Sequence, residues 1–126
     1  MPSSSNLPPD DRISKFLRHG KDVMADRMTV RPRAFSLTKE KKLSAVHTQN
    51  MTEKSIWQWA DKHLKSEGEI DKRADLKVKD IFSVGLKIDY DNKPPRHLNI
   101  IGWPPDKHKE LKSRQDLAKL AKPRFR

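Results

Sequence analysis

Four side chains suited to binding or catalysis lie close together in the segment PPRHLNIIGWP; they are Arg96, His97, Asn99 and Trp103. Side chains alternate between the two faces of a strand, so an extended conformation puts His97 and Asn99 on one face and Leu98 and Ile100 on the other. A histidine can serve as a general acid or base near neutral pH, and an asparagine amide can donate to a developing oxyanion. We expect Leu98 and Ile100 to face the core and the polar pair to lie on a more accessible face.

Two further arginines, Arg31 and Arg33, flank Pro32. The proline favours an extended conformation at Arg31, and forked guanidinium groups on an extended segment suit phosphate contacts. An anionic ligand near His97 would need positive charge, so a functional site predicts that Arg33 and Arg96 lie beside the polar face of that strand. The alternative is that these arginines are solvated loop residues.

The 126-residue chain carries a net charge of +11. Residues 12–33 contain seven Lys or Arg against two Asp, and residues 104–126 contain eight against three acidic residues, so each stretch has a net charge of +5. Basic excess at chain ends is typical of arms that bind nucleic acid. In the C-terminal stretch, the candidate phosphate-binding residues are Lys112, Arg114 and Lys119. The alternative is ordinary solubilising charge.

Several kinds of site are excluded by composition and spacing. The chain has no cysteine, so neither a disulfide nor a thiolate metal site can form. Its four glycines form no phosphate-binding loop motif, and its five histidines have no metal-ligand spacing. We therefore expect no metal and no cofactor. The N-terminus has no basic and apolar signal pattern and no segment has the length of a membrane span, so we expect a cytoplasmic protein without membrane contact.

The pattern of apolar residues predicts an α+β fold, with a small antiparallel sheet packed against two or three helices. Helices are expected over 51–65, 77–83 and 105–121, and strands around 43–46, 86–90 and 97–103, the last two forming an antiparallel pair. Residues 12–27 fit a weak, short helix, because Ile13, Phe16 and Leu17 have helical spacing. Trp57 is expected in the main core, whereas Trp59 falls off the apolar stripe and is expected to be partly exposed.

The chain is expected to form a single α+β domain over residues 12–122. It is preceded by a disordered leader at 1–11 and followed by a basic tail at 123–126, because these ends offer little apolar surface to offset the entropy of ordering.

The segments RPRAFSL, LSAV, RADLKVKDIFSVGLKIDYD and, above all, PPRHLNIIGWP show a wider likeness. Through them, the stretch from Arg31 to Ala121 resembles an uncharacterised group of small bacterial proteins. That group has no settled activity, so the resemblance implies no reaction and no cofactor. It favours a role for PPRHLNIIGWP beyond packing.

Three functions follow as hypotheses. The first is a basic protein that binds or associates with nucleic acid, DNA or RNA, through the arginines and lysines named above. The second is a small enzyme with its site around His97 and Asn99. The third is a protein-interaction module that uses Trp59 as an interface anchor.

Overall fold

Six strands and three α-helices are present in the parts of the chain that the computed structural model describes, residues 7–18, 20–64 and 70–126. The strands are β1 (Arg12–Leu17), β2 (Leu43–His47), β3 (Lys72–Lys77), β4 (Lys87–Asp89), β5 (His97–Ile101) and β6 (Lys122–Phe125). The helices are α1 (Glu53–Leu64), α2 (Val78–Ser83) and α3 (Lys107–Leu120), with short 3₁₀ helices η2 (Gly20–Asp22) and η3 (Pro32–Phe35). Neighbouring strands are antiparallel in the order β4-β5-β2-β1-β3-β6, which confirms the expected α+β fold.

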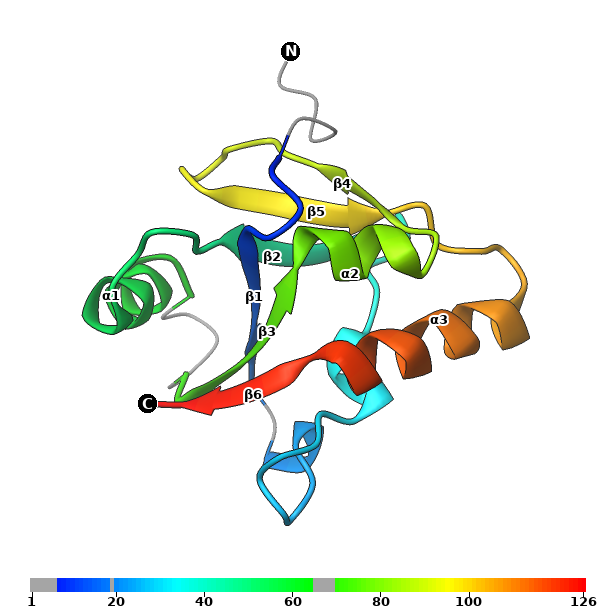
Figure 1. The fold of residues 1–126 in the computed structure, drawn as a ribbon, viewed down its shortest axis with the longest axis horizontal. Helices are drawn as coiled ribbons and strands as arrows, with labels where there is room; N and C mark the ends of the chain where they lie inside the picture. Colours follow the sequence, from blue (N-terminus) through cyan, green and yellow to red (C-terminus); the bar gives the residue numbers. More distant parts are fainter. Residues whose placement is uncertain (1–6, 19, 65–69) are drawn as a thin grey trace.

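The sheet consists of two halves that meet at a narrow junction. β1 pairs with β3 along its whole length, and β2 pairs with β5 from Leu43 to Val46. β1 and β2 pair with each other only at Ile13↔His47 and Ser14↔Val46. In Figure 1, β2, β4 and β5 run across the view whereas β1 and β3 run down it, so the halves are steeply inclined and the central strands separate beyond the junction.

One face of the sheet carries the larger hydrophobic core and is covered by α2, α3 and η3 (Figure 1). The most deeply buried members of this core come from strands and helices alike and include Ile13, Leu43, Leu98, Ile100, Val78, Ile81, Leu117 and Phe35. Burying one such side chain stabilises a fold by about 1.5–3 kcal/mol. This layer therefore supplies most of the apolar stabilisation of the fold.

The opposite face is only partly apolar, and α1 covers the apolar part. Ile56, Trp57 and Ala60 of α1 pack there against Phe16, Val46 and Ile70. Trp57 is buried, as expected, but in this smaller cluster rather than in the main core. The same face also carries polar side chains, among them Ser14, Ser44 and Asn99.

The helices predicted over 51–65, 77–83 and 105–121 and the three predicted strands are confirmed. α1, α2, α3, β4 and β5 lie within the expected ranges, β2 extends one residue beyond its range to His47, and β4 and β5 form the expected antiparallel pair. The caps explain where two helices begin. The Thr52 hydroxyl accepts from the Ser55 amide at 3.1 Å, and the Asp106 carboxylate accepts from the Lys109 amide at 3.0 Å. Both bonds satisfy amides that a first helical turn leaves unpaired.

The helix expected in residues 12–27 is wrong, because residues 12–17 form the central strand β1. Ile13, Phe16 and Leu17 have helical spacing, but Ile13 and Leu17 enter the larger core while Phe16 enters the cluster under α1. A strand buried on both faces has no alternating apolar pattern, so its sequence resembles that of a helix. The neighbouring strand β3 was missed as well, and its buried face includes the charged Arg73.

The predicted disorder at the two ends of the chain was also too extensive. Residues 122–125 form the edge strand β6 on β3, and Nη1 of Arg126 lies 2.7 Å from Oδ1 of Asp61, so the expected free tail is wrong. In the leader, Leu7 packs against the larger core, and the carbonyls of Pro9 and Asp11 accept hydrogen bonds from α2. Residues 7–11 are therefore ordered, whereas residues 1–6 lie outside the described residues.

Candidate functional site

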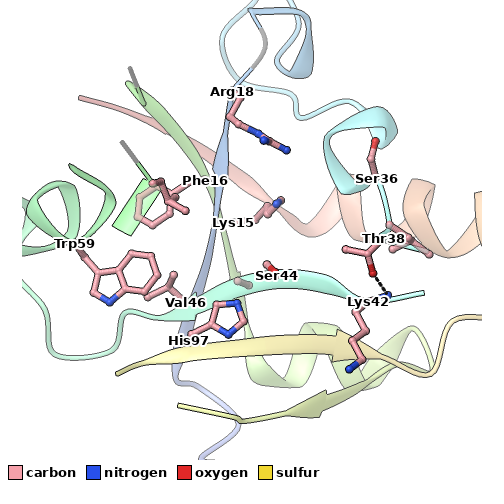
Figure 2. A pocket seen from close by; sticks show the side chains of 13 residues that line it. Lys15, Phe16, Arg18, Ser36, Thr38, Lys42, Ser44, Val46, Trp59 and His97 are labelled. Atoms are coloured by element: carbon pink, nitrogen blue, oxygen red, sulfur yellow. Dashed lines mark hydrogen bonds between the residues drawn. The ribbon is translucent and has the colours of Figure 1, made fainter. Parts of the chain in front are cut away.

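A pocket of about 360 Å³ opens where β1 and β2 separate. Beyond Ser14 and Val46 the two strands no longer pair, and the splay leaves space between them. Figure 2 shows side chains from both strands, from α1 and from the segment after η3 arranged around this space. The lining residues are Lys15, Phe16, Arg18, Ser36, Leu37, Thr38, Lys42, Ser44, Ala45, Val46, Trp59, Leu64 and His97. The volume falls within the range of sites for small ligands.

Three cationic side chains contribute to the lining. Lys15 and Arg18 come from β1 and the residue after it, and Lys42 directly precedes β2. No acidic residue lines the pocket within the described residues. Positive groups around a concave surface of low polarisability concentrate a positive potential there, so the pocket attracts anions.

The pocket also has an aromatic wall. The rings of Phe16 and Trp59 are stacked with their centroids 6.0 Å apart and an interplanar angle of 10°. The His63 ring lies 4.5 Å from that of Trp59, and the Trp59 indole donates to the Pro95 carbonyl at 2.9 Å. Trp59 is thus half-buried and held by several contacts. It presents a rigid apolar surface to the pocket rather than a mobile side chain.

Hydroxyl groups line the side of the pocket opposite the aromatic wall. Thr38 and Lys42 close a tight loop, in which the Thr38 amide donates to the Lys42 carbonyl at 3.0 Å and the Thr38 hydroxyl accepts from the Lys42 amide at 3.3 Å. This loop places Lys42 in the pocket lining, and in Figure 2 its ammonium group points away from Lys15 and Arg18, toward β5. Ser36 and Ser44 add two further hydroxyls to the lining. Hydroxyls and cations together are the groups that hold phosphate oxygens.

His97 borders the same pocket from β5. The strand register places it opposite Val46, on the same face of the sheet as Ser44. Its Nδ1 lies 2.7 Å from Oδ1 of Asp91, while the other carboxylate oxygen of Asp91 accepts from the Asn99 amide at 3.2 Å. Burial raises the pKa of Asp91, but the hydrogen bonds from His97, the Lys93 amide and Asn99 outweigh it and hold that pKa below its usual value.

The predicted strand faces are confirmed in part. Leu98 and Ile100 are fully buried in the larger core, and His97 is half-buried at the pocket. Asn99 shares the face of His97 but is only 8% exposed, so its expected accessibility is wrong. Its amide is committed to Asp91, and it positions that carboxylate instead of meeting solvent.

Arg33 and Arg96, which were expected beside the polar face of His97, do not line the pocket, and neither does the third candidate, Arg31. Nη1 of Arg96 donates to the backbone carbonyls of His47 at 2.8 Å and Gln49 at 3.0 Å, so this side chain fastens a loop. Nε of Arg33 lies 3.5 Å from Asp22. Arg31 precedes η3 with an exposed side chain. The cations that do line the pocket are Lys15, Arg18 and Lys42.

The candidate residues of the C-terminal helix are engaged with acidic neighbours or exposed. Nζ of Lys112 lies 2.8 Å from Oδ1 of Asp116, and Arg114 pairs with the partly buried Glu110, which also binds Lys41. Lys119 is exposed near the end of α3. The helix therefore neutralises part of its own charge. The charge count of residues 104–126 does not reveal this, because the ion pairs depend on which side chains share a helix face.

The pocket cations escaped the sequence reasoning for a local reason. Lys15 and Arg18 belong to the segment read as a helix, and Lys42 ends the sequence KEKK, which reads as a turn. The residues are brought together by the strand arrangement, and no motif links them. The one available signal is that Lys15 interrupts the apolar residues of this segment, Ile13, Phe16 and Leu17.

Comparisons with known proteins add no relative: no family model, curated protein or solved structure matches this chain. Across the described ranges, no helix has the length and apolarity needed to cross a membrane. In the same ranges, no group of three or more His, Asp or Glu side chains is arranged as a metal site.

Proposed function

We propose that the protein binds single-stranded nucleic acid, with one nucleotide of the strand held in the pocket between β1 and β2. The observation that carries this proposal is the lining itself: Lys15, Arg18 and Lys42 beside the aromatic wall, with no acidic residue among the described lining side chains. Proteins that bind single strands combine a positive groove for the backbone with aromatic surfaces for the bases. The net charge of +11 supports a polyanionic partner.

Single strands fit this pocket better than a duplex does. A nucleotide of a single strand can turn its base out of the strand and enter a concave site, whereas the bases of a duplex are stacked inside it. The contacts of Trp59 give less support to a protein-interaction module, because its indole N–H already donates to the Pro95 carbonyl and its ring forms part of the pocket wall.

The test compares two pairs of lysines of equal charge. Lys15→Gln with Lys42→Gln removes two charges from the pocket, and Lys112→Gln with Lys119→Gln removes two from α3. Binding of a fluorescent single strand is measured by anisotropy at several salt concentrations, with both variants checked for folding by circular dichroism. We expect the pocket pair to weaken binding about tenfold and to reduce the slope of log affinity against log salt by about 0.7 for each cation removed.

The α3 pair is expected to change affinity less than about threefold, because contacts outside the pocket contribute only general attraction. Equal losses in the two variants would show that the charge acts as a diffuse field and not through the pocket. If a free nucleoside monophosphate binds as tightly as a single strand, the ligand of the pocket is a small molecule and not nucleic acid. Equal affinity for a duplex and a single strand would also overturn the proposal.

A further inference from the structure

Two histidines are each paired with an aspartate, and they differ at the second ring nitrogen. Nε2 of His47 lies 2.8 Å from Oδ2 of Asp11, and its Nδ1 lies 3.2 Å from the Tyr90 hydroxyl, so both nitrogens are used. His97 uses Nδ1 with Asp91, and its Nε2 has no hydrogen-bond partner among the described residues. Of the two histidines, His97 is the one that borders the pocket.

The Asp91 pair sets the protonation pattern of the His97 ring. The lowered pKa of Asp91, reached despite burial, keeps this group ionised at neutral pH. An ionised carboxylate can only accept a hydrogen bond, so the nitrogen that faces it must carry the hydrogen. Neutral His97 therefore has its hydrogen on Nδ1 and its lone pair on Nε2. Asn99 donates to the other oxygen of Asp91 and thereby fixes the carboxylate. A histidine held in this way is a proton acceptor of defined direction.

We propose that His97 is the general base of an RNA-cleaving site in the pocket, with a ribose 2′-hydroxyl as the nucleophile. The proposal rests on the proposed function, because the strand must first bind. Three observations support it together: the ring of His97 is oriented by Asp91, His97 lies in the pocket lining with Nε2 unpaired among the described residues, and Lys15, Arg18 and Lys42 belong to the same lining. His47, with its partners Asp11 and Tyr90, does not line the pocket and has no ring nitrogen left over.

The reaction balances without an added reagent. Nε2 of His97 takes the proton of the 2′-hydroxyl, the 2′ oxygen forms a bond to the adjacent phosphorus, and the bond from phosphorus to the 5′ oxygen breaks. The departing 5′ oxygen takes a proton from water, and the hydroxide so formed takes the proton from His97. The products are a 2′,3′-cyclic phosphate and a 5′-hydroxyl end. Cations stabilise the charge that grows on the phosphate oxygens in the transition state.

DNA serves as the internal comparison for this step. It has the phosphates and bases that the pocket is suited to hold, but it lacks the 2′-hydroxyl that His97 would deprotonate. We therefore expect single-stranded DNA to bind and stay intact, and RNA of the same sequence to bind and be cleaved. A strand of RNA with one 2′-deoxy position should resist cleavage at that position alone.

The experiment follows the cleavage of a labelled RNA strand by excess protein, with product ends identified by mass spectrometry. We expect His97→Gln to slow cleavage by about 10²–10⁴-fold, the usual contribution of a general base, while its affinity for DNA stays within about threefold. Asp91→Asn tests positioning, because an amide donor facing Nδ1 favours the opposite tautomer and should slow cleavage with binding retained. His108→Gln, at an exposed position of α3, is the matched control and should cleave at the wild-type rate.

Three results would overturn the inference. Intact RNA in the presence of bound wild-type protein would remove the cleavage while leaving the proposed binding in place. Cleavage by His97→Gln at the wild-type rate would assign it to another group or to a contaminant. Products with a 5′-phosphate would exclude the 2′-hydroxyl as nucleophile. Failure of RNA and DNA to bind at low salt would instead refute the proposed function itself.

Discussion

The two faces of the sheet are closed in different ways. On one face, α2, α3 and η3 cover a continuous apolar layer that extends from β4 to β6. On the other, α1 covers the apolar strip around Phe16 and Val46, and the splay between β1 and β2 leaves a pocket at its border. The covered face carries most of the stability. The partly covered face carries the candidate site, because polar and cationic side chains there can reach solvent.

The same difference appears in how the two regions treat charge. On α3, the carboxylates of Glu110 and Asp116 meet lysines and arginines along the helix and from the loop before β2. Around the pocket, cations from separate segments share the lining with hydroxyls and aromatic rings. A high charge count is therefore a poor guide to a binding site.

The largest effect is expected at the apolar strip under α1. Trp57→Ala should reduce the free energy of unfolding by about 3–5 kcal/mol, since it removes a buried aromatic side chain and leaves a cavity. Chemical denaturation measures it. Phe82→Ala on α2, where the ring is 40% exposed, is the control and should cost less than about 1 kcal/mol. An unchanged midpoint for Trp57→Ala would mean that α1 contributes no packing and that the faces do not differ as described.

A smaller loss is expected from the ion pairs of α3. Glu110→Gln removes the carboxylate that binds both Lys41 and Arg114 and should cost about 1–2 kcal/mol, as expected for partly buried bonds between charged groups. Asp116→Asn, which removes a more exposed pair with Lys112, should cost less than about 0.5 kcal/mol. Equal costs for the two substitutions would contradict the distinction between buried and exposed pairing on this helix.

The loss of stability at acidic pH should depend on the same carboxylate, that of Glu110. The hydrogen bond from Lys41, with further help from Arg114, lowers the pKa of Glu110 against the opposing effect of burial. A carboxylate whose pKa is lower in the folded state than in the unfolded state stabilises the fold at every pH above its unfolded-state pKa. This stabilisation is lost as the pH falls through the folded-state pKa, so the contribution of Glu110 should fade below about pH 4. The melting temperature should therefore decrease less steeply between neutral and acidic pH for Glu110→Gln than for the wild type. Parallel curves for variant and wild type would refute this.

The smallest effect on stability is expected at the pocket. Lys42→Gln should change the free energy of unfolding by less than about 0.5 kcal/mol, because the side chain is exposed and the loop is held by backbone and Thr38 contacts. The same substitution should weaken binding of a single strand. Denaturation and anisotropy on one sample test both statements. A variant that loses stability and affinity together would make Lys42 a structural residue and remove the contrast between the faces.

Prediction from sequence succeeded where the information is local. The apolar stripe of α1 and the alternation around Leu98 and Ile100 each specify a nearby backbone conformation. It failed at β1, whose residues are buried on both faces, and at β6, whose polar residues gain their order from pairing with β3. Edge pairing leaves little trace in a short segment.

The amino-acid sequence by itself determined the positions of the helices, the buried face of β5 and the positive charge of the chain. Tertiary structure alone decided which cations line the pocket. Lys15 and Lys42 are far apart in sequence and meet at one pocket because β1 and β2 pair at one end and separate at the other. Likewise, the role of His97 depends on Asp91, which reaches it across the turn between β4 and β5. Distances between such side chains are set by strand pairing and sheet twist, and these follow from packing of the whole domain.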